Sequence, residues 1–108
     1  MTVKELSEHQ AFEIITMPQP EREIKNVYIG DLLSLAMSKV QADNAWITIQ
    51  TNLNIVAVAS LTDASVIVIP EGLSLEEIIT KTAEDKEVMI MVTELTAYEI
   101  CKALGKYL

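Results

Sequence analysis

The chain has 108 residues, half of them apolar, and carries a formal net charge of −8 at pH 7. This length suits one compact domain over residues 1–108, and the apolar content excludes a disordered chain. The negative charge argues against nucleic-acid and anionic-membrane partners, because both are bound through clustered Lys and Arg. No signal peptide is evident, no apolar run approaches the ~18 residues that span a bilayer, and a single cysteine fits a reducing compartment. We therefore expect a cytoplasmic protein.

The first part of the chain predicts a short helix followed by two strands. Thr2–His9 begins with T-V-K-E, a capping box in which Thr and Glu satisfy the first backbone N–H groups of a helix. The apolar residues of Ala11–Thr16 indicate a strand. Two prolines place a loop at Met17–Glu23, and Val27–Ile29 is a short apolar strand that ends in a glycine.

The middle of the chain predicts a helix, a strand and a second helix. Asp31 is expected to cap a helix that continues to about Val40. Ala45–Gln50 is a strand, and the polar loop Thr51–Asn54 leads from it into the helix Ile55–Leu61. Apolar side chains surround the axis of this last helix, so it must be covered on both sides.

The last third continues the alternation of strand and helix. Ser65–Ile69 is an unbroken apolar strand, and Ser74–Lys86 is a helix that opens with the capping box S-L-E-E. Replacing Ser74 with Ala should then cost ~1 kcal/mol. Val88–Val92 is a buried strand, and T-A-Y-E from Thr96 starts the final helix. Such alternation predicts an α/β three-layer sandwich with a mainly parallel sheet of about five strands.

No residue pattern points to catalysis, to a cofactor or to a metal. Three widely spaced glycines exclude both the phosphate loop and the dinucleotide-binding turn. His9 is the only histidine and lies near the end of a polar helix, where we expect it to be solvated. Cys101 lies on the apolar side of the last helix and is interpreted as a small core residue. The acidic residues between 76 and 87 are interpreted as a solvated face.

A polar cluster at the end of the Ala45–Gln50 strand is the candidate ligand site. It comprises Thr48, Gln50, Thr51, Asn52 and Asn54. Ligands of open α/β sheets bind at the carboxyl ends of strands, and Asn54 could cap a helix whose free N–H groups suit an anion. Gly30 and Asp31 would rim this pocket if the two strand ends are adjacent. The alternative is that Asn52 and Asn54 only satisfy the backbone of the loop.

A self-associating surface is the second candidate site. A helix exposing Val56 or Val58, beside another exposing Leu35 or Met37, would forgo several kcal/mol, because each fully buried side chain is worth roughly 1.5–3 kcal/mol. A two-fold interface would cover these residues, which predicts a homodimer. The alternative is that the N-terminal helix and the following loop cover the same surface within one monomer.

Three segments resemble the DRTGG domain family. They are G-D-L-L-S at Gly30–Ser34, A-W-I-T-I-Q-T at Ala45–Thr51 and N-I-V-A-V-A at Asn54–Ala59. Such domains are related to the N-terminal domain of HPr kinase/phosphorylase and to regulatory domains of phosphotransacetylases and CBS-domain pyrophosphatases. The resemblance implies a non-catalytic α/β module that commonly pairs with a copy of itself. The acidic and basic pair of the family would fall at Thr51 and Asn52, where this chain has no charge.

Two functions follow as hypotheses. The first is a non-catalytic regulatory or interaction module, self-associating and acting on a partner enzyme or domain. The alternative is a sensing domain for a small ligand, a nucleotide or an anion, with its pocket at Thr48 to Asn54. An enzyme is the least expected, for want of an acid and base with evident geometry.

Overall fold

A five-stranded sheet lies at the centre of the computed structural model, which describes all residues from 1 to 108. The strand order is β1-β5-β4-β3-β2; β1 runs antiparallel to β5, and the other neighbouring pairs are parallel. The strands are β1 (Phe12–Thr16), β2 (Asn26–Ile29), β3 (Asn44–Ile47), β4 (Val66–Ile69) and β5 (Ile90–Thr93). The mainly parallel sheet expected from the alternating pattern is confirmed.

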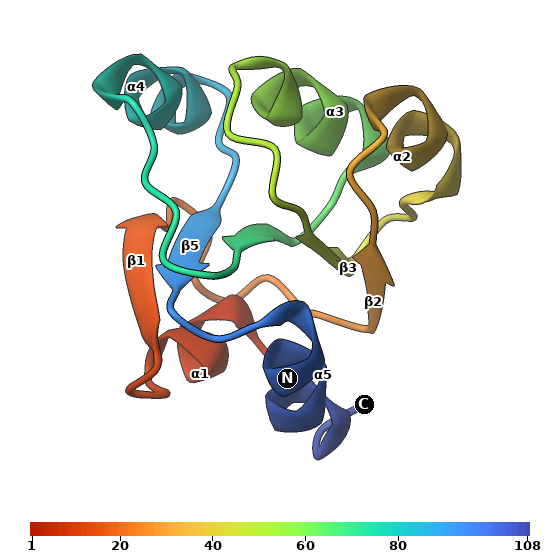
Figure 1. Ribbon diagram of the computed structural model, residues 1–108, viewed down its shortest axis with the longest axis vertical. Helices are drawn as coiled ribbons and strands as arrows, with labels where there is room; N and C mark the ends of the chain where they lie inside the picture. The colour runs from red at the N-terminus through yellow and green to blue at the C-terminus, as the bar shows by residue number, and fades with distance from the viewer.

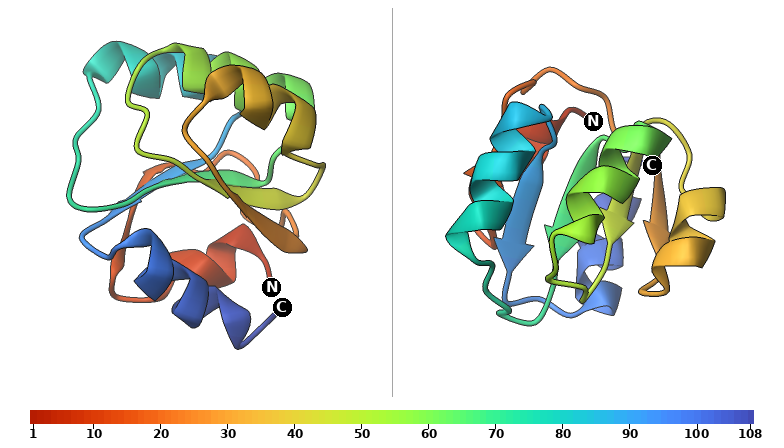
Figure 2. Two further views of the ribbon diagram at one scale, coloured as in Figure 1. Left: turned by 45° about the vertical axis from the view of Figure 1, so that its right-hand side comes forward. Right: turned by 90° about the horizontal axis from the view of Figure 1, so that it is seen from above.

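Five helices cover the two faces of this sheet. They are α1 (Val3–Ser7), α2 (Leu33–Lys39), α3 (Asn54–Thr62), α4 (Glu77–Asp85) and α5 (Ala97–Gly105). Helices α2, α3 and α4 lie side by side on one face, and α1 and α5 cover the other, which confirms the three-layer sandwich (Figures 1 and 2). None of the helices has the length and apolar character needed to cross a membrane.

The sheet separates two apolar cores. Every residue of β3 and β4 is buried, as expected for continuous apolar strands that are covered on both faces. Because strand side chains alternate between faces, Trp46 and Ile67 belong to the core beneath α2, α3 and α4, whereas Ile47 and Val68 belong to the core against α1 and α5. The same two strands therefore support both layers of helices.

Two of the predicted capping boxes are present. In α1 the Thr2 hydroxyl accepts from the N–H of Glu5, and the Glu5 carboxylate accepts from the N–H of Thr2. The same reciprocal pair joins Thr96 and Glu99 at the start of α5. Both helices thus begin where the local pattern predicted.

The other three predicted caps are wrong. Helix α4 begins at Glu77 rather than after Ser74, and neither α4 nor α2 nor α3 has a side-chain cap. Asn54 is the first residue of α3 instead of its cap, and the carboxylate of Asp31 accepts a hydrogen bond from Thr48, just after β3. Ser74 caps no helix because it lies in the loop after β4. This loop is hydrogen-bonded to the segment around Thr93 at the end of β5, and α4 starts only after it.

The expected exposure of the central helix is also wrong. Val56 is 1% exposed and Val58 is 6% exposed, because α3 packs between α2 and α4 on the sheet (Figure 1). These two residues therefore belong to the core of one chain and cannot line an interface between folded copies. Leu35 and Met37 on α2 are exposed, as predicted. Helix α1, the alternative cover, lies on the opposite face.

Candidate functional site

The carboxyl ends of β2 and β3 lie side by side, because the two strands are parallel neighbours and Ile29 pairs with Ile47. Asp31, two residues beyond β2, is held against the end of β3. Its carboxylate accepts from the Thr48 hydroxyl at 3.0 Å and from the backbone N–H of Ile49 at 2.9 Å. The structure thus brings together Asp31 and Thr48, which the sequence placed at two separate strand ends.

Further hydrogen bonds extend this arrangement into the loop before α3. Gln50 Nε2 donates to the Asp31 carbonyl oxygen at 2.8 Å, and Asn52 Nδ2 donates to Gln50 Oε1 at 2.9 Å. Asn52 Oδ1 accepts from the N–H of Asn54 at 2.9 Å. We call these residues, Asp31, Thr48, Gln50, Asn52 and Asn54, the Asp31 network. The polar groups predicted to meet a ligand bond to one another and hold two loops together.

The two remaining predicted residues have different surroundings. The carbonyl oxygen of Gly30 accepts from Trp46 Nε1 at 2.9 Å, which anchors the end of β2 to the only tryptophan. No side-chain hydrogen bond joins Thr51 to the Asp31 network. Hollows of about 460, 330 and 180 Å³ are present elsewhere, and none of the three is lined by the predicted ligand-site residues.

Exposed apolar side chains lie on the chain segments that carry the Asp31 network. Leu32 is 64% exposed and Leu35 is 45% exposed at the start of α2. We refer to these two residues, with the exposed Ile29 at the end of β2 and the exposed Ile49 and Leu53 after β3, as the β2–β3 patch. This patch adjoins β2, which lies at the edge of the sheet and has a partner strand on one side only.

The titratable side chains show no activated nucleophile. Partial burial raises the pKa of the Cys101 thiol, which disfavours the thiolate needed for nucleophilic attack. His9 is exposed, and its ring packs edge-on against Phe12. No group of three or more His, Cys, Asp or Glu side chains lies close enough together to hold a metal ion.

Sequence reasoning missed the hollow of about 460 Å³. It is lined by the start of β1, the end of β5, the loop after β4 and α4. Its walls come from segments far apart in the chain, so no single stretch of sequence predicts it. The P-E-G turn at Pro70–Gly72 was the one local signal at this place.

Comparison with known proteins gives a likeness in fold. No protein-family model matches the chain, and no curated protein matches it by sequence. It is similar to the crystal structure of the CBS and DRTGG domains of the regulatory region of Clostridium perfringens pyrophosphatase, complexed with the activator diadenosine tetraphosphate. The TM-score is 0.76 at 10% sequence identity, over 94% of this chain and 44% of that chain.

This chain therefore spans less than half the length of the clostridial structure. At 10% identity the likeness establishes the fold. The fold expected from the DRTGG resemblance is confirmed, because nearly the whole chain superposes on a structure that contains such a domain.

Proposed function

We propose that residues 1–108 form one DRTGG-like, non-catalytic regulatory module of the cytoplasm, which pairs with a second copy of itself and acts on a partner enzyme or domain. The observation that carries this proposal is the β2–β3 patch. Large apolar patches exposed on a folded domain mark interaction surfaces. The likeness to the regulatory region of a pyrophosphatase supports the regulatory part of the proposal.

The β2–β3 patch is not needed by the core of a single chain. Helix α2 packs on the sheet through Ala36, and Val40 follows it into the same core, whereas Leu32 and Leu35 point away from that core. Completing the burial of several Leu and Ile side chains would contribute a few kcal/mol, at roughly 1.5–3 kcal/mol for each side chain fully buried. The Asp31 network already fixes the loops that carry Leu32, Ile49 and Leu53, so little conformational freedom would be lost on association.

A second copy is the partner that this surface favours. The patch includes Ile29 at the end of β2, and the outer edge of β2 has no neighbouring strand. Two copies related by a two-fold axis could bring the same edge and the same apolar side chains together, so that each patch covers the other. The net charge of −8 on each copy opposes association, so the favourable free energy of a dimer would have to come from apolar contacts.

Sedimentation velocity at micromolar concentration tests this proposal. We expect the wild-type chain to sediment as a dimer, and Leu35→Glu to sediment as a monomer, because the new carboxylate would be desolvated at the interface. Ile78→Glu is the matched control: Ile78 is 53% exposed on α4, at the other end of the same layer of helices. Its variant should remain a dimer. A monomeric wild-type chain, or a dimeric Leu35→Glu variant, would contradict the proposal.

Ligand sensing at Thr48 to Asn54 is the second candidate function. It is favoured by polar side chains that converge where two parallel strands end. The clostridial regulatory region was solved with a nucleotide activator, which supports testing nucleotides first. A thermal-shift screen with nucleotides and inorganic anions should raise the melting temperature of the wild-type chain and not that of Asn52→Ala. No stabilisation, or stabilisation unaltered in the variant, would count against this site.

A further inference from the structure

The hollow of about 460 Å³ lies where the connections from two neighbouring strands leave on opposite faces of the sheet. From β4 the chain passes to α4 on one face, and from β5 it passes to α5 on the other (Figure 2). In open α/β sheets such a reversal opens a crevice at the carboxyl ends of the strands, and ligands bind there. The volume falls within the roughly 300–1,000 Å³ of small-molecule sites.

The walls of this hollow are held in place without a ligand. The N–H groups of Glu71 and Gly72 donate to the carbonyl oxygens of Leu95 and Thr93, both at 2.9 Å, which ties the loop after β4 to the end of β5. The buried Thr93 hydroxyl in turn donates to the carbonyl oxygen of Ala11 at 2.6 Å, next to the start of β1. Three segments are thereby joined into one preformed rim.

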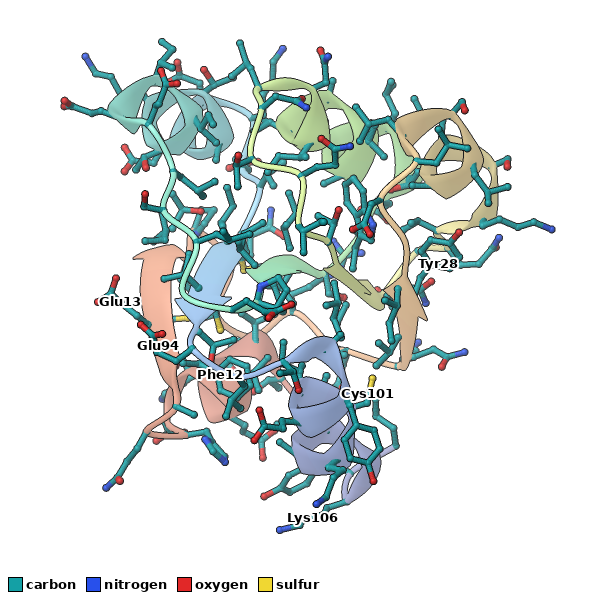
Figure 3. All side chains as sticks on the ribbon, in the orientation of Figure 1. Phe12, Glu13, Tyr28, Glu94, Cys101 and Lys106 are labelled. Carbon is teal, nitrogen blue, oxygen red and sulfur yellow. The ribbon has the colours of Figure 1, made fainter.

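Two carboxylates set the electrostatic character of the hollow. Glu13 on β1 and Glu94 just beyond β5 both line it, and Figure 3 shows them at the same end of the neighbouring strands. Neither forms an ion pair with the chain's own cations, and no Lys, Arg or His lines the hollow. An excess of negative charge at close range favours a cation.

Gly72 lets the Glu94 carboxylate lie against the rim. Its φ is +71°, a backbone conformation that residues with a side chain rarely adopt, and a Cβ there would lie 2.5 Å from Glu94 Oε2. Both residues line the hollow. The turn after β4 therefore makes room for a charged group at the mouth of the hollow.

The rest of the lining points to an organic cation. Ile15, Leu75 and Val92 supply apolar wall, and Ser74 and Thr80 supply hydroxyl groups. A divalent metal is a poor fit, because Ca²⁺ takes about six to eight oxygen ligands and no cluster of three acidic side chains is present. We propose that this hollow binds a small organic cation, an ammonium or guanidinium group on a short apolar body, with Glu13 and Glu94 facing the charge.

NMR titration of the backbone amides with hexylamine tests the proposal. We expect saturable shifts confined to residues 10–15, 72–75 and 92–94, with hexanol and hexanoate binding about tenfold or more weakly, because they lack the positive charge. The double variant Glu13→Gln with Glu94→Gln should lower the hexylamine affinity by a similar factor of about ten. Both residues are exposed and outside the chain's ion pairs, so this variant should still fold.

Glu84→Gln is the matched control, because Glu84 is an exposed carboxylate on α4 that does not line the hollow. It should bind hexylamine as the wild-type chain does. Equal binding of hexanol or hexanoate, unchanged affinity in the double variant, or shifts centred elsewhere would overturn the proposal. The outcome is separable from self-association, since the hollow adjoins β1 and the β2–β3 patch lies at the opposite edge of the sheet.

Discussion

Asp31 illustrates how one side chain changes role between sequence and structure. An aspartate just before a helix is a typical cap, yet here the N-cap position is Leu32 and the Asp31 carboxylate bonds to Thr48 and Ile49. The neighbouring strand offers a hydroxyl and an N–H at the right distance, and a carboxylate accepts from both. A contact between strands replaces the local one.

Asp31→Ala should therefore destabilise the fold. Hydrogen bonds to charged groups contribute about 1.5–3 kcal/mol, and the Thr48 hydroxyl, in a side chain that is almost fully buried, would lose its acceptor. We expect a loss of about 1–3 kcal/mol in the free energy of unfolding, measured by urea denaturation. Asp85→Ala, at an exposed position at the end of α4, is the control. Equal effects of the two substitutions would refute the role assigned to Asp31.

The interaction of Asp43 with Arg22 should make the fold less stable in acid. The hydrogen bond from Arg22 holds the pKa of the Asp43 carboxyl below its usual range. The carboxyl of an unfolded Asp has a pKa of about 3.9. Above that pH the interaction of Asp43 with Arg22 contributes fully to the free energy of unfolding, and the contribution is lost as the pH falls through the lower pKa of the folded state. The Asp43 contribution to the free energy of unfolding should therefore decrease as the pH falls below about 4.

Arg22→Gln separates this contribution from the others. The capping boxes lower the pKa of Glu5 and Glu99 through hydrogen bonds from Thr2 and Thr96. Protonation of these two carboxylates in acid therefore also lowers the free energy of unfolding. The variant keeps both capping boxes and loses the ion pair with Asp43. Its free energy of unfolding should decrease less steeply with falling pH, and an unchanged slope would contradict the assignment.

At the scale of whole elements, matching sequence patterns gave different helix starts. T-A-Y-E at Thr96 and S-L-E-E at Ser74 carry the same capping signal, but α5 begins at its signal and α4 begins two residues later than expected. After β5 the chain turns at once into α5. After β4 the loop first bonds to the end of β5, and Ser74 lies outside the helix.

Two substitutions test this difference between α4 and α5. Thr96→Ala should cost about 1 kcal/mol, because the N–H of Glu99 loses its acceptor. Ser74→Ala should change stability by less than about 0.5 kcal/mol, because Ser74 caps no helix. Urea denaturation of both variants measures the two effects. A loss of unfolding free energy in Ser74→Ala equal to that in Thr96→Ala would show that Ser74 does cap α4 in solution.

At the scale of the whole molecule, one sheet joins two apolar cores. Trp46 lies in the core beneath α2, α3 and α4, and Leu104 lies on α5 in the other. Both are fully buried. Because β3 and β4 contribute side chains to both cores, the two layers should unfold together.

Leu104→Ala tests this cooperativity. Removing a buried Leu costs about 2–5 kcal/mol, so the urea midpoint should fall. The fluorescence of Trp46, on the opposite face, should report the same shift as far-UV circular dichroism. Leu108→Ala, at the exposed end of the chain, is the control. A Trp46 transition that stays at the wild-type midpoint would show that the two cores unfold independently.

Local patterns by themselves determined the α/β class, the strands and helices and two of the five expected caps, because periodicity and capping depend on residues a few positions apart. Tertiary structure decided the rest. The strand order brings Asp31 to Thr48, packing buries Val56 and Val58, and the pairing of β1 with β5 beneath α4 brings Glu13 and Glu94 to one hollow. Each of these depends on groups far apart in the chain, which no window of sequence contains.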